Sequence, residues 1–238
     1  MKKLFEKGGK LELFYPLYEM VESILVAKPK KTLIGSHIRD NIDTKRFMTI
    51  VIIAGIPSML FGIYNAGLQH FVSLGITNAS YQDIFIKGLF IFIPILAVSY
   101  MAGGFWEMLF AVVRKHEVNE GFLVTGFLIP LIVPPTIPLW QVAVATSFGV
   151  VVGKEVFGGT GMNVFNPAIV ARAFLFFAYP GAISGNGVWT TFGDKIVDTY
   201  TKATPLSIAV VNKGAGIVEG LSAKGYTLQN MFVGTIPG

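Results

Sequence analysis

One stretch restricts the possible folds more than any other. Residues 88–113 read GLFIFIPILAVSYMAGGFWEMLFAVV, with Glu107 as the single charged side chain. A helix rises ~1.5 Å per residue and the hydrocarbon core of a bilayer is ~30 Å thick, so this stretch is long enough to cross a membrane. Residues 48–62 form a second apolar block. Only 14% of the residues are charged, against about 25% in soluble domains. The sequence therefore predicts an all-α, polytopic membrane protein.

The composition excludes several other classes of protein. The chain has no cysteine, which excludes disulfides and cysteine-ligated iron–sulfur clusters within it. Its three histidines are isolated in the sequence, so we expect no metal site from this chain alone. The net charge of +5 does not indicate nucleic-acid binding, because the basic residues cluster beside the predicted spans, as the positive-inside rule describes.

Charge and apolar blocks divide the chain into four predicted regions. Residues 1–46 are basic and lack a span, so we expect a cytoplasmic segment with an interfacial helix and no cleaved signal peptide. Residues 47–180 are predicted to be the transmembrane helical region. Residues 181–225 are predicted to be an extracytoplasmic loop, and residues 226–238 the start of a further span at which the chain is cut short. We expect about five to six spans, some of them broken or half helices.

The first four spans are predicted at 47–66, 88–113, from 121 onward, and 139–153. The loop between the first two, residues 67–86, contains no Lys or Arg, as expected outside the cytoplasm. The third span meets PLIVPPTIP at 130–138, and each interior proline removes a helical hydrogen bond. Irregular backbone at membrane depth is tolerated only inside protein or beside a cavity. We therefore predict a short span followed by a tight outer turn.

A helix is predicted to begin at Asn166-Pro167, because proline suits the first helical position. The glycine-rich GGTG and Asn163 precede it, and backbone amides at a helix start favour anions; the glycines alternatively serve only a sharp turn. Arg172 lies within this helix, which has no acidic residue. We expect it to neutralise an anionic cofactor or to pair with an acid on another helix.

Two further motifs have competing interpretations. GGFWE places Gly103 and Gly104 before Glu107; an acid in a span usually faces a cavity or a partner. The alternative is a glycine pair for helix packing, with Glu107 close to the inner interface. GVVVGKE at 149–155 does not match the spacing of a phosphate-binding loop, so its small residues are better explained by helix packing.

The polar segment DTYTKATPL at 198–206 also has two interpretations. Locally, Thr204 as the N-cap and Pro205 at the first helical position make a good helix start. The residues themselves give the Thr204 hydroxyl no other task.

Long motifs make the chain similar to a known family, the B-type subunits (NqrB) of the sodium-translocating NADH:quinone oxidoreductases, over nearly its whole length. The resemblance rests on SHIRDNIDTKRFM (36–48), YNAG (64–67), GGFWEMLFAVVRKHEVNEGF (103–122), LIVPPTIPLWQ (131–141), FGVVVGKEVFGGTGMNVFNPA (148–168), RAFLFFAYP (172–180) and ATPL (203–206).

The resemblance implies one component of a six-subunit complex in the bacterial inner membrane that passes electrons through flavins to quinone and exports sodium. It implies FMN bound covalently to a threonine by a flavin transferase, a role in holding riboflavin, and contact with membrane lipid. Asp198, Thr201, Ala203 and Thr204 match the transferase motif, with Thr204 as the acceptor, whereas Lys202 replaces the usual small residue.

The resemblance also implies that Gly103, Gly104 and Glu107 lie toward the quinone. Arg172 and Asn163 are further candidates for cofactor contact. Two alternatives stay open: the D-type subunit (RnfD) of an Rnf-type ferredoxin:NAD oxidoreductase, and a membrane transporter without redox chemistry, in which broken helices line a substrate path.

Overall fold

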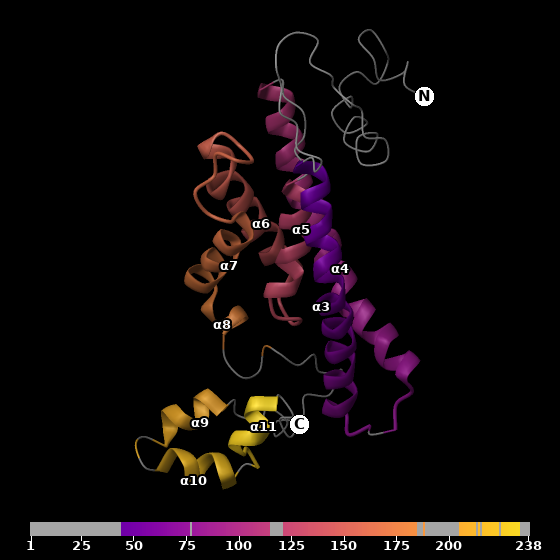
Figure 1. Cartoon of the computed structure of the whole chain (residues 1–238), viewed down its shortest axis with the longest axis vertical. Helices are drawn as coiled ribbons and strands as arrows, with labels where there is room; N and C mark the ends of the chain where they lie inside the picture. The colour runs from indigo at the N-terminus through magenta and orange to yellow at the C-terminus, as the bar shows by residue number, and fades with distance from the viewer. Residues whose placement is uncertain are drawn as a thin grey trace, which may run out of the picture.

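The computed structural model describes residues 44–76, 78–114, 121–184, 188, 205–212, 214, 216–223 and 225–233. Every regular element within these residues is a helix, which confirms the all-α prediction (Figure 1). Most of the predicted cytoplasmic segment, with its interfacial helix, lies outside the described residues.

Two long helices are the full-length spans of the described part of the chain. α3 covers Thr44–Ser73 and α4 covers Tyr81–Arg114, and both are long and apolar enough to cross a membrane. They extend beyond the predicted 47–66 and 88–113, so the predicted loop 67–86 shrinks to residues 74–80. The physical reason is that hydropathy marks where the hydrocarbon ends, whereas helical hydrogen bonding continues into polar turns beyond it.

The predicted break after the third span is confirmed. α5 covers Gly121–Ile132 and α6 covers Leu139–Gly153, and the proline-rich turn separates them. The twelve residues of α5 rise roughly 18 Å, which is less than a bilayer's hydrocarbon thickness. α5 is therefore a short helix whose end must be satisfied by other protein groups.

The segment after α6 turns sharply before the next helix. A 3₁₀ turn, η2 (Glu155–Phe157), is followed by glycines with positive φ at Gly158 (112°), Gly159 (101°) and Gly161 (92°). α7 then covers Pro167–Ala178, capped by the Asn166 side chain, which accepts a hydrogen bond from Ala168 N at 2.9 Å. Both the helix start at Pro167 and the sharp-turn interpretation of the glycines are thereby confirmed.

The last part of the chain is more helical than predicted. The short helix α8 (Pro180–Ile183) follows α7. The region predicted as a loop contains α9 (Pro205–Val211), which begins where Thr204 and Pro205 predicted a helix start, and α10 (Gly216–Ala223). α11 (Leu228–Val233) lies in the region predicted to start a further span. In Figure 1 these helices lie beyond the end of the bundle where α8 lies.

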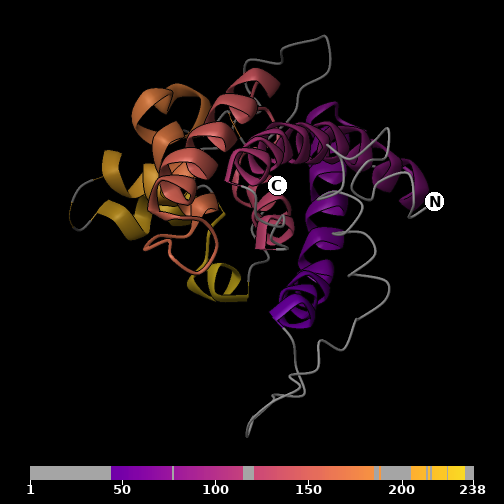
Figure 2. The same ribbon diagram turned by 90° about the horizontal axis from the view of Figure 1, so that it is seen from above.

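α4 is the central helix of the bundle. It contacts α3, α5 and α6, while α7 packs on α6 and α5, and Figure 2 shows α3 and α7 on opposite sides of α4. The main apolar core lies among α4 to α8 and contains Ile95, Ile129, Val133, Ile137, Val142, Ala145, Ala168, Ala171, Leu175 and Ile183. As its small residues predicted, the GVVVGKE segment serves the packing of helices and does not form a phosphate-binding loop.

Replacing Gly149 with alanine is expected to destabilise the contact between α6 and α7. A Cβ at this position would lie 2.5 Å from the Pro167 carbonyl oxygen and 2.8 Å from the Ala171 Cβ, so the helices must separate, at a cost of about 1–3 kcal/mol. Thermal unfolding of the full-length protein in detergent measures the loss. Gly62→Ala is the matched control, because a Cβ there meets nothing within 4 Å. Equal unfolding temperatures for the two variants would contradict this packing role.

Candidate functional site

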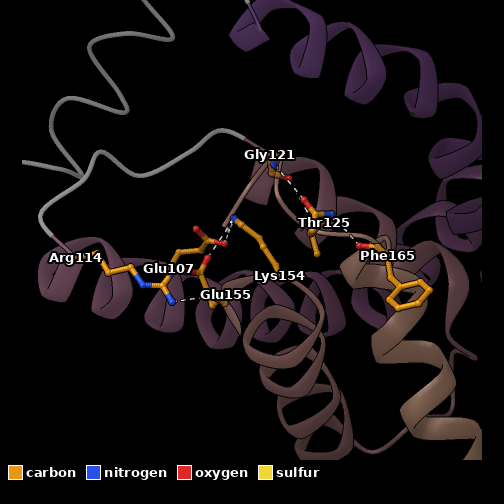
Figure 3. A network of polar contacts seen from close by, with 9 residues as sticks. Glu107, Arg114, Gly121, Thr125, Lys154, Glu155 and Phe165 are labelled. Carbon is orange, nitrogen blue, oxygen red and sulfur yellow. Dashed lines mark hydrogen bonds and ion pairs between the residues drawn. The ribbon is translucent and has the colours of Figure 1, made fainter. Parts of the chain in front are cut away.

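Four charged side chains gather where α4 ends and α6 turns into η2 (Figure 3). We call Glu107, Arg114, Lys154 and Glu155 the ionic cluster. Glu107 and Lys154 are each only 3% exposed and Glu155 is 0% exposed, whereas the Arg114 side chain is 34% exposed. A charged group this deeply buried is costly unless it is paired.

The sequence brings these groups together through helix geometry. Glu107 belongs to the buried stripe of α4, which contains Ile84, Gly88, Phe92, Ile95, Ser99, Gly103, Glu107 and Ala111. Arg114 is seven residues after Glu107, which is about two turns along the same side. Lys154 and Glu155 come from the helix that packs on α4: they directly follow α6, which ends at Gly153. Packing of α6 on α4 therefore completes the cluster.

The ion pairs connect all four side chains. Lys154 Nζ donates to Glu107 Oε1 and lies 3.8 Å from Glu155 Oε1. Arg114 Nη1 donates to Glu155 Oε2 at 3.1 Å, and Arg114 Nη2 donates to the Glu155 carbonyl oxygen at 2.8 Å. The Arg114 guanidinium also lies 4.9 Å from the centre of the Phe110 ring. Two acids and two bases cancel, so the cluster can be buried without net charge.

One carboxylate oxygen of the ionic cluster can accept a further hydrogen bond. Glu155 Oε1 is buried and accepts no hydrogen bond from any residue in the described ranges, and the Lys154 ammonium at 3.8 Å is its nearest charge partner. A carboxylate oxygen in this position can accept one further donor or a cation, since ionised carboxylates are acceptors only.

The two glycines of GGFWE lie one turn from the ionic cluster. Gly103 is buried, and a Cβ there would lie 2.8 Å from Phe122 Cζ and 3.2 Å from Thr146 Cγ2. Gly104 has more room, with Phe122 Cε1 3.6 Å from such a Cβ. The structure thus shows that Gly103 permits close packing of α5 on α4. Contact of Gly103, Gly104 or Glu107 with quinone stays a prediction.

Asn163 shapes the turn that leads into α7. Its Oδ1 accepts from Gly161 N at 3.1 Å and its Nδ2 donates to the Phe165 carbonyl oxygen at 2.8 Å. These bonds hold the glycine-rich turn in place beside the start of α7. Contact of Asn163 with a cofactor stays a prediction.

Arg172 has a partner that the sequence did not suggest. Its Nη1 donates to the Ile132 carbonyl oxygen at the end of α5, whereas we expected a carboxylate or an anionic cofactor. The last carbonyls of a helix have no intrahelical donor, and Pro135, three residues after Ile132, lacks the N–H that could donate to it in a 3₁₀ turn. The guanidinium therefore satisfies the broken end of α5 from α7.

Replacing Arg172 with leucine is expected to lower stability by about 1.5–3 kcal/mol, because the Ile132 carbonyl loses a charged donor. Arg172→Gln retains a neutral donor and is expected to lose less. Thermal unfolding of the full-length protein in detergent gives the comparison. An Arg172→Leu variant as stable as the unaltered protein would show that this hydrogen bond contributes little.

The predicted flavin motif lies outside the described residues. This applies to Asp198, Thr201, Ala203 and Thr204. The first described residue after them is Pro205, which begins α9, in agreement with the predicted helix start.

Arg114, Lys154 and Glu155 were not among the site residues predicted from the sequence, although one signal was available. Glu107 lies in an apolar block and needs a counter-charge, and Lys154 directly follows the span predicted at 139–153. Which basic residue pairs with Glu107 depends on how α6 packs against α4, and the sequence alone does not specify this packing.

Comparison with known proteins gives a consistent result. Residues 32–238 match the sequence profile of the NQR2, RnfD, RnfE family. The B-type subunit of the Na(+)-translocating NADH-quinone reductase from Stutzerimonas stutzeri (strain A1501) is 48% identical over 256 residues, which cover 98% of this chain and 61% of that protein. The corresponding protein of Yersinia pestis is 45% identical over 262 residues, covering 98% and 62%. The chain thus spans about three-fifths of the length of these relatives.

Proposed function

We propose, from the premise that the chain belongs to the NQR2, RnfD, RnfE family, that it acts as the B-type subunit of a sodium-translocating NADH:quinone oxidoreductase. In this role it carries covalently bound FMN and passes electrons through flavins to quinone, coupled to sodium export. The observation that carries the proposal is the 48% identity across 98% of the chain to a protein named as that subunit. The two full-length apolar helices fit a membrane protein.

The flavin is proposed to be attached at Thr204, with Asp198, Thr201 and Ala203 as the recognition residues of the flavin transferase. When bound, FMN supplies the redox chemistry, and the chain sets its position and surroundings. Two observations support an extracytoplasmic location for Thr204. The basic N-terminal segment favours the cytoplasm, and α9, which begins right after Thr204, lies at the end of the bundle away from the ionic cluster.

The remaining site residues take proposed roles around this pathway. Gly103, Gly104 and Glu107 lie on the side of α4 that faces α5 and α6, where we place the quinone. Asn163 and Arg172, which hold the turn before α7 and the end of α5, are proposed to contact a bound anionic cofactor. Sodium is the transported cargo, and the other five subunits, the flavin transferase and inner-membrane lipid are the proposed partners.

The RnfD component of an Rnf complex is the second candidate, because the matching family includes it. The relatives from Stutzerimonas stutzeri and Yersinia pestis, at 45–48% identity, are both named as the quinone reductase component, which favours the first candidate. Neither relative favours a transporter without redox chemistry.

The deciding experiment uses the full-length protein assembled with the other subunits in membranes. We expect NADH-driven quinone reduction that rises when sodium is added, together with flavin fluorescence of this protein's band in a denaturing gel. Electron transfer between ferredoxin and NAD without quinone reduction would identify the Rnf alternative. A non-fluorescent band and no redox activity would overturn both redox proposals.

A further inference from the structure

A second polar site lies at the opposite end of α4 from the ionic cluster. There the end of α3 and the start of α4 line a shallow, open cavity of about 610 Å³. Its polar lining comes from Asn78, Ser80, Asp83 and Lys87. Across the described residues, neither the Asp83 carboxylate nor the Lys87 ammonium has a hydrogen-bond or ion-pair partner. Both charges are thus available to a ligand.

The cavity lies at the level of a lipid headgroup. Residues 88–106 contain no charged side chain, and at ~1.5 Å per residue this run covers about 28 Å, close to the ~30 Å of the hydrocarbon core. Glu107 follows one end of the run and Lys87 precedes the other. If the run spans the hydrocarbon, Lys87 lies at its boundary and Asp83 lies one turn farther toward water.

The order of the two charges matches one class of lipid. Asp83 and Lys87 are four residues apart and therefore neighbours along one side of α4. In a zwitterionic phospholipid, the phosphate is joined to the acyl-bearing glycerol and the ammonium lies beyond it. Lys87, the deeper group, can pair with the phosphate, while Asp83, the outer group, can pair with the ammonium. In phosphatidylglycerol the group beyond the phosphate is an uncharged glycerol, so Asp83 would have no cationic partner.

The apolar walls of the cavity complete the fit. Phe71, Ile76, Ile86 and Phe90 line it beside the polar residues, and Ile86 and Phe90 are 50% and 73% exposed. Phe90 lies about one turn beyond Ile86, in the apolar part of α4 where acyl chains would run. We propose that this cavity is a binding site for a zwitterionic phospholipid, with Lys87 on the phosphate and Asp83 on the ammonium.

The test compares lipids on the delipidated full-length protein in detergent. Phosphatidylethanolamine is expected to raise the melting temperature by about 2–4 °C more than phosphatidylglycerol, as expected for binding to the folded state alone. Retention of one phosphatidylethanolamine in native mass spectrometry is a second measurement. Soluble glycerophosphoethanolamine, which has the same charges without acyl chains, is expected to give a smaller shift.

The matched variant carries Asp83→Lys together with Lys87→Asp, which keeps the net charge but reverses the order of the charges. It is expected to lose the preference for phosphatidylethanolamine, whereas Glu219→Gln on the exposed part of α10 is expected to keep it. If the reversed variant does not fold, Lys87→Gln with Asp83→Asn takes its place with the same expectation. An unchanged preference in these variants, an equal response to phosphatidylglycerol, or no response to either lipid would overturn the proposal.

Discussion

Replacing Lys154 with methionine is expected to destabilise the folded protein by about 3–5 kcal/mol, because the variant leaves Glu107 as a buried charge without its ammonium partner. Glu107 and Lys154 are both 3% exposed, so water cannot replace the lost partner. Glu155 Oε1, 3.8 Å from the Lys154 ammonium, loses the same charge. The free energy of unfolding, measured by denaturant titration of the full-length protein in mixed micelles, is the quantity to compare.

A double variant separates pairing from simple loss of volume. Glu107→Gln combined with Lys154→Met removes both charges, and we expect it to recover a large part of the stability lost in Lys154→Met alone. Replacing a complete buried ion pair is often nearly neutral, whereas breaking one is not. The single variant Glu107→Gln completes the comparison. If the double variant loses as much stability as Glu107→Gln and Lys154→Met together, the two side chains do not interact across α4 and the end of α6.

Arg114→Met is the comparison within the same cluster. The Arg114 side chain is 34% exposed, so water can screen Glu155 in its absence, and the loss is expected to be smaller than for Lys154→Met. An equal or larger loss for Arg114→Met would mean that burial does not decide the contribution of each pair.

Thr204→Val is expected to abolish covalent flavin completely, because a phosphoester requires the threonine hydroxyl. The measurement is ultraviolet fluorescence of the denatured protein band after expression with the flavin transferase. The unaltered protein is expected to fluoresce and the variant to give no signal. Valine has nearly the shape of threonine, so a general packing defect does not explain the loss.

Two controls make the Thr204 result specific. Thr227→Val removes an exposed hydroxyl that accepts a hydrogen bond from Asn230 N at 3.1 Å, and this variant is expected to stay fluorescent. Lys202→Gly restores the usual small residue of the transferase motif and is expected to fluoresce at least as strongly as the unaltered protein. Fluorescence that persists in Thr204→Val would assign the flavin to a different residue.

The two ends of the bundle carry different chemistry. At one end, α4 and α6 bury an ionic cluster with balanced charge. At the other end lie the cavity lined by Asp83 and Lys87 and the helix that begins right after Thr204. If the proposed function holds, the flavin on Thr204 and the quinone beside Gly103, Gly104 and Glu107 lie toward opposite ends of the bundle. Electrons that pass from the flavin to the quinone would then cross most of the bundle.

The sequence by itself determined the helical class, the two long spans, the break at the prolines and the starts of α6, α7 and α9. These features depend on local physics. Apolar run length fixes which segments enter the membrane, proline removes backbone donors, and Asn166 with Pro167 forms a cap from neighbouring residues. The sequence did not set the true ends of α3 and α4, because helices continue past the hydrocarbon without a change in backbone bonding.

Only the tertiary structure decided the partners of the charged residues. Arg172 contacts the Ile132 carbonyl, 40 residues away in the chain, and Lys154 pairs with Glu107, 47 residues away. Such pairs depend on which faces of α4, α5, α6 and α7 pack together. Several pairings would satisfy the same composition, because a buried charge requires a partner of opposite sign or a strong acceptor and does not specify which one. Helix packing makes that choice.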